Sequence, residues 1–181
     1  MTDTPSPDLV PIAGDEVATL LGSLDRQRVT FGWKSGGLDV DGLRATVGSS
    51  SMSLGGLVKH LALVEDHYFN VRLTGSAPIP PFDAVDFDAD PEWEWRTGAQ
   101  DDPAELYALW ERTVASSRAA VQKALTAGGL DTPMQPWPDG RSPSLRRTIV
   151  DLIEEYARHV GHADLLRESV DGLVGEDPPR P

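Results

Sequence analysis

Four long segments with helical spacing of apolar residues, separated by stretches rich in Gly and Pro, restrict the fold of this chain most. In the first segment, about residues 15–34, Leu20, Leu24 and Phe31 recur at intervals of four and seven, and Gly36-Gly37 ends the pattern. The other three segments cover about residues 54–73, 103–127 and 145–170. The chain shows no internal repeat and no convincing strand. These features predict an all-α four-helix bundle with long connecting loops.

The predicted helix ends carry the residue types that such ends favour. Ser53 and Ser144 stand where N-caps are expected for the second and fourth helices. Pro103 suits the first turn of the third helix, which we expect to end before Gly128-Gly129. The bundle domain is expected over residues 14–172, between an N-terminal tail (1–13) and a C-terminal tail (173–181).

The connection between the second and third helices, residues 75–102, is rich in Pro, Asp and Trp. At nearly thirty residues it is too long for a passive connector in a compact domain, so we expect it to cover something. Trp93 and Trp95 in this stretch, and Trp137 in the next loop, would then either roof a pocket or cap the bundle. We favour capping of the bundle.

Charge and composition exclude several functions. The 181 residues include 29 acidic and 16 basic side chains, a formal net charge of −13. Such an acidic chain is unsuited to bind nucleic acid or an anionic membrane surface. No apolar run approaches the roughly 20 residues that span a bilayer, and no signal segment starts the chain. We therefore expect a cytoplasmic protein with neither a nucleic acid nor a membrane as partner.

Cysteine is absent from the chain, which excludes disulfides, thiolate ligands and a Cys nucleophile. A transition metal would need His, Asp, Glu or water as ligands. Any thiol chemistry would need a thiol from outside the protein.

All four histidines lie on the second and fourth predicted helices. At about 100° per residue, His60 shares a largely apolar face with its neighbours one turn away, so it is expected to point into the bundle. Glu155 and His159 are one turn apart, about 6 Å along the helix axis, which suits two ligands of one ion. His159 and His162 would suit equally. His60 can therefore join either Glu155 and His159, or His159 and His162.

Simpler interpretations exist for these residues. An inward histidine is often hydrogen-bonded in the core, and Glu155 with His159 could form an i,i+4 salt bridge. His67, two turns beyond His60, could line the cavity or hydrogen-bond in the core. The other flank of the fourth helix, with Glu154, Arg158 and Arg167, has the pattern of a solvated face.

Two segments, SLGGLVKHLALVEDHYF (53–69) and LIEEYARHVGHADLLRE (152–168), resemble the signature helices of the DinB superfamily. They are most similar to its branch that includes mycothiol-dependent maleylpyruvate isomerase and related thiol transferases. The resemblance implies a four-helix bundle with a divalent metal bound by His60, Glu155 and His159. Many members have His at the position that corresponds to Glu155, whereas the isomerase branch has Glu there. His162 falls where Gln often stands, which implies a role beside the ligands or facing the substrate.

Two histidines and one carboxylate leave coordination positions open, as in catalytic metal sites. The resemblance implies zinc, with nickel, iron or manganese as alternatives, and mycothiol as the thiol cosubstrate. The predicted function is a thiol S-transferase or thiol-dependent isomerase acting on a small electrophile. The alternatives are a metal-dependent hydrolase of a small amide or ester, and a non-enzymatic stress-response binding protein. The expected partner is a small-molecule substrate, with a homodimer as one option for assembly.

Overall fold

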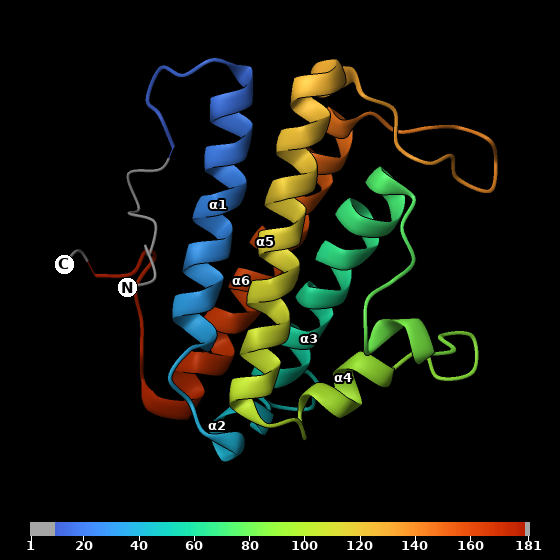
Figure 1. The fold of residues 1–181 in the computed structure, drawn as a ribbon. Coiled ribbons are helices and arrows are strands. Elements are labelled where there is room, and N and C mark those ends of the chain that lie inside the picture. Colours follow the sequence, from blue (N-terminus) through green and yellow to red (C-terminus); the bar gives the residue numbers. More distant parts are fainter. Residues whose placement is uncertain (1–9, 180–181) are drawn as a thin grey trace.

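The computed structural model describes residues 10–179 and confirms the predicted all-α bundle (Figure 1). Four long helical segments form it: α1, α3 with its π-helical continuation η2, α5 and α6. Their bounds are Glu16–Ser35 (α1), Leu54–Glu65 (α3), Asp66–Arg72 (η2), Pro103–Gly128 (α5) and Leu145–Asp171 (α6). No β-strand occurs among the described residues, although Pro133 and Ser144 form an isolated antiparallel bridge.

The loops hold four short helical elements that the spacing of apolar residues did not predict. These are α2 (Val40–Arg44), the 3-10 helices η3 (Phe82–Ala84) and η4 (Gly129–Asp131), and α4 (Trp93–Gly98). Most of the predicted N-terminal tail, residues 1–9, and residues 180–181 of the predicted C-terminal tail lie outside the described residues. No helix of the described part has both the length and the apolar character needed to cross a membrane.

The predicted caps are present. The hydroxyl of Ser53 accepts a hydrogen bond from the Gly56 amide at 3.1 Å, and that of Ser144 from the Arg147 amide at 3.3 Å. Asp102 caps α5 directly before Pro103. These side chains satisfy amide groups that have no partner within their own helix.

A polar cluster lies inside the bundle. Glu65 of α3 is fully buried and accepts hydrogen bonds from Arg28 of α1 at 2.7 and 2.8 Å. The hydroxyl of Tyr156 on α6 donates to Glu65 at 2.8 Å and accepts from the Trp110 indole of α5 at 2.9 Å. Each long helical segment therefore contributes to one hydrogen-bonded group, which burial strengthens against competition from water.

Arg167 contradicts the predicted solvated flank of α6, because it is only 8% exposed. Its guanidinium donates hydrogen bonds to the carbonyl oxygens of Lys34 at 3.2 Å and Gly36 at 2.6 Å, and its Nε donates to Asp171 at 3.0 Å. The last carbonyls of a helix lack partners in their own helix, so a cation beside them is favourable. Packing of α6 against the end of α1 therefore buries a residue that looks solvated in the sequence.

The connection 75–102 folds back on the bundle, so that α4 packs beside α3 (Figure 1). Gly55 and Gly98 let the two helices approach closely: a Cβ on Gly55 would lie 2.3 Å from the Gly98 carbonyl oxygen. The ammonium of Lys59 adds an ion pair with Asp101 at 2.6 Å and lies 4.1 Å from the centre of the Trp93 ring. This connection therefore covers α3.

Removing the hydroxyl of Tyr156 tests the polar cluster. Tyr156→Phe should lower the free energy of unfolding by about 1–3 kcal/mol, because buried polar groups of Glu65 and Trp110 each lose a partner. Urea denaturation measures this. Tyr68→Phe is the matched control, since Tyr68 is half-buried and its hydroxyl has no hydrogen-bond partner in the described residues. It should change stability by less than about 0.5 kcal/mol. Equal effects of the two substitutions would contradict the role of Tyr156.

The close approach of α3 and α4 gives a second prediction. Gly55→Ala should destabilise the protein by about 1–3 kcal/mol, because the added methyl group meets backbone that must move. Gly161→Ala, on an open stretch of α6 with no atom within 4 Å of the new Cβ, should instead stabilise the protein by about 0.5–1 kcal/mol. Thermal and urea unfolding of the two variants compare them directly. A Gly55→Ala protein as stable as Gly161→Ala would refute the close approach.

Candidate metal centre

Three side chains from two helices meet beside α4. His60 lies on α3, and Glu155 and His159 lie one turn apart on α6. Each offers a ligand atom, and these atoms all lie within 4.8 Å of one another. Glu155 Oε1 is 3.0 Å from His60 Nε2 and 3.1 Å from His159 Nε2. One carboxylate oxygen and two imidazole nitrogens thus converge, a donor set suited to a divalent transition metal.

The electrostatics of the three residues are coupled. Hydrogen bonds from His159 and His60 hold the pKa of Glu155 well below its usual range. Burial lowers the pKa of His60, but hydrogen bonds with Glu155 and Glu94 outweigh it and raise the pKa overall. The carboxylate is therefore kept charged where a cation would bind.

The ring nitrogens that face away from Glu155 also have partners. His60 Nδ1 lies 3.4 Å from Glu94 Oε1, and His159 Nδ1 lies 3.3 Å from His162 Nδ1. The structure thus brings His162 to the other edge of the His159 ring and not to His60. Of the two ligand sets that spacing left open, the one containing Glu155 is the set that converges.

Trp95 forms one wall of the site. Its ring stacks on that of His60, with centroids 4.4 Å apart and planes at 21°, and lies 6.0 Å from that of His159. Trp93 instead packs against Phe82, and Trp137 lies on the surface against Arg141. The role as a pocket wall, which we had not favoured for the tryptophans, therefore holds for Trp95.

A family model described as mycothiol-S-transferase matches residues 19–172. The chain belongs to the mycothiol-S-transferase family. The matched range contains the three converging residues as well as Glu94 and Trp95. This match confirms the resemblance to the thiol-transferase branch of the DinB superfamily. A search of curated proteins found no match.

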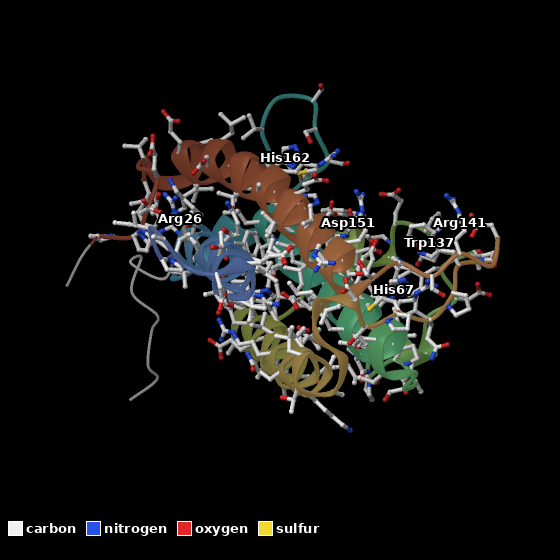
Figure 2. All side chains as sticks on the ribbon, turned by 90° about the horizontal axis from the view of Figure 1, so that it is seen from above. Arg26, His67, Trp137, Arg141, Asp151 and His162 are labelled. Carbon is white, nitrogen blue, oxygen red and sulfur yellow. The ribbon has the colours of Figure 1, made fainter. Side chains whose placement is uncertain are left out.

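The remaining histidine of this mycothiol-S-transferase family member lies apart from the converging residues. His67 is on η2, exposed, with its ring packed edge-on against Tyr68. Its exposure excludes the core position that we had considered for it. In Figure 2, which views the molecule from above, His162 and His67 lie at well separated places.

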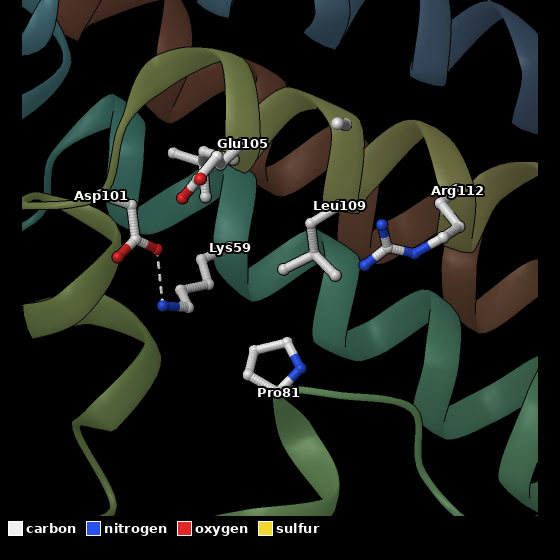
Figure 3. A pocket seen from close by; sticks show the side chains of 8 residues that line it. Lys59, Pro81, Asp101, Glu105, Leu109 and Arg112 are labelled. Atoms are coloured by element: carbon white, nitrogen blue, oxygen red, sulfur yellow. Dashed lines mark hydrogen bonds and ion pairs between the residues drawn. The ribbon is translucent and has the colours of Figure 1, made fainter.

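A groove of about 390 Å³ lies on another side of α3 (Figure 3). Lys59, next to His60 in the sequence, lines it together with residues of α5 and the loops around α4. The other lining residues are Pro81, Asp101, Glu105, Leu106, Ala108, Leu109 and Arg112. None of the three converging residues belongs to it, so the groove and the candidate metal centre are separate features.

Glu94 is the site residue that sequence reasoning missed. It lies in the segment Trp93-Glu94-Trp95, inside the connection that we expected to cover something. An acidic residue between two tryptophans was the available signal. That signal did not indicate which helix the segment would pack against.

The choice between Glu155 and His162 gives a prediction for metal affinity. Glu155→Ala should weaken zinc binding more than His162→Ala. Loss of a residue that only contacts a ligand, as His162 contacts His159, lowers metal affinity by only about 10–100-fold. His60→Ala and His159→Ala should abolish stoichiometric binding. Competition with a chromophoric chelator measures each affinity, and Glu154→Ala, at the exposed neighbouring position, is the control. A stronger effect of His162→Ala than of Glu155→Ala would make His162 the ligand.

Proposed function

We propose that this protein is a divalent-metal-dependent thiol S-transferase, or a thiol-dependent isomerase, that uses mycothiol on a small electrophile. The observation that carries the proposal is the convergence of two imidazole nitrogens and one carboxylate oxygen within 4.8 Å in a chain of this family. We propose zinc as the metal, with nickel, iron and manganese as alternatives.

The three residues offer donor atoms that suit a divalent ion, and solvent can reach them. The side chains of His60 and Glu155 are 17% and 32% exposed, so a small molecule can reach them from solvent. His60, Glu155 and His159 would leave coordination positions of such a metal open, and the metal would supply a positive charge that favours the thiolate form of a nearby thiol at neutral pH. Because the protein has no cysteine, that thiol must come from solution.

The other residues of the site orient the ligands. The Nδ1 atoms of His159 and His162 face each other, so one of them carries the proton of this hydrogen bond. When His159 carries it, the lone pair of His159 Nε2 is free to bind a metal. The Trp95 ring restricts rotation of the His60 imidazole and covers that side of the site. The protein thus holds both imidazoles with Nε2 toward Glu155.

The proposed transfer forms one bond from sulfur to carbon. The thiol loses its proton to solvent, its sulfur attacks an electrophilic carbon, and the leaving group departs with its electron pair. With monobromobimane as the test electrophile, the products are the thioether, bromide and one proton. In the isomerase variant, the thiol would add to the substrate and be released again, with no net change in the thiol.

Mycothiol and monobromobimane test this function. Zinc-loaded protein should accelerate formation of the fluorescent thioether over apo protein, and His60→Ala should remove the acceleration. The advantage should be greatest below the pKa of a free thiol, about 8.5, because free thiolate is scarce there. It should shrink as pH rises and the uncatalysed thiolate becomes plentiful. Fluorescence stopped-flow across this pH range, with Glu154→Ala as control, gives the rates.

Glutathione and bacillithiol should be compared in the same assay. We expect mycothiol to react fastest. No metal-dependent acceleration with any of the three thiols would overturn the proposal and favour the hydrolytic or non-enzymatic alternative. Hydrolysis of an ester or amide without thiol would then identify the former.

A further inference from the structure

We propose that Glu94 is a positioning residue that accepts a hydrogen bond from His60 Nδ1 and so directs Nε2 toward the metal. The inference rests on the proposed metal-dependent function and concerns a residue outside the converging triad. Glu94 comes from α4, an element separate from the two helices that supply the triad.

The contact lies in a buried setting. Glu94 Oε1 is 3.4 Å from His60 Nδ1, and the residue is only 7% exposed. Its other oxygen, Oε2, is buried and has no hydrogen-bond partner among the described residues. A buried carboxylate with so few partners is unfavourable for stability alone. Its place beside the His60 imidazole therefore points to a role in holding that imidazole.

Several contacts hold α4 where this interaction can form. Gly55 and Gly98 permit backbone contact between α3 and α4, and Trp95 stacks on His60. Lys59, adjacent to His60, binds Asp101 just after α4 and lies over the Trp93 ring. The residues on either side of Glu94 in the sequence, Trp93 and Trp95, therefore both pack against side chains of α3. Its approach to His60 is built into the packing of α4 and does not depend on a free loop.

The protonation chemistry of imidazole gives the contact its purpose. A neutral imidazole carries one proton, and only the nitrogen without it can bind a metal. A carboxylate facing Nδ1 favours the proton there. With an ion bound, the Nε2 lone pair would then face the ion in place of the proton that Nε2 donates to Glu155. His159 has a different partner at its Nδ1, the imidazole of His162. Glu94 is therefore the carboxylate that can do this for His60.

The test compares Glu94→Ala, Glu94→Gln and the control Glu92→Ala in zinc competition. Glu92 is exposed and precedes the same short helix. Glu94→Ala should weaken zinc binding by about 10–100-fold. Glu94→Gln should weaken it less, because the amide oxygen still accepts from Nδ1, and Glu92→Ala should match the wild type. The isosteric Glu94→Gln also serves if Glu94→Ala does not fold.

A spectroscopic readout separates positioning from general stability. In zinc-loaded, ¹⁵N-labelled protein, the Nδ1 proton of His60 should give a slowly exchanging, downfield signal. The signal should persist in Glu92→Ala and be lost to exchange with water in Glu94→Ala. Through-bond correlations within the imidazole ring assign the signal to His60.

The outcomes distinguish this inference from the proposed function. Wild-type protein that binds none of zinc, nickel, iron and manganese overturns both. Normal zinc binding together with a retained His60 signal in both Glu94 variants overturns the role of Glu94 and leaves the function standing. Loss of binding as complete as in His60→Ala would also overturn it, because Glu94 would then be a ligand.

Discussion

The buried ion pair between Arg28 and Glu65 is the interaction on which the arrangement of the bundle depends. Removing one partner of such a pair typically costs about 3–5 kcal/mol, because the other charge stays buried and unpaired. The pair joins α1 to α3, and the Tyr156 hydroxyl extends it to α6. A helix that shifted along its axis by one residue, about 1.5 Å, would break these bonds.

This cluster also aligns the candidate site. Glu65 follows His60 by five residues on α3, and Tyr156 directly follows Glu155 on α6. Because Tyr156 donates to Glu65, the relative register of α3 and α6 is set close to His60 and Glu155, two of the candidate ligands. The polar cluster and the candidate metal centre are therefore linked, because the same contact that sets the register of α3 and α6 also places the three converging side chains.

The connection 75–102 contributes a second layer around the site. It turns two aromatic rings and one carboxylate toward α3, while Lys59 and the Gly55–Gly98 contact secure it. His60 is consequently held on three sides: by Glu155, by the Glu94 carboxylate and by the Trp95 ring. A site built in this way reduces the freedom of its ligands before an ion arrives, which favours binding.

The sequence by itself determined the four long helices, because apolar spacing and end residues such as Ser53 and Ser144 act locally. It also placed His60 on one helix and Glu155 with His159 on another, while the resemblance to known signature helices distinguished Glu155 from His162. Only the tertiary structure decided that Arg167 is buried at the end of α1, and that Glu94 and Trp95 reach His60. Helical periodicity gives the face on which a side chain lies. Which loop packs against that face depends on contacts between residues far apart in the chain, such as Gly55 with Gly98, and no local pattern records them.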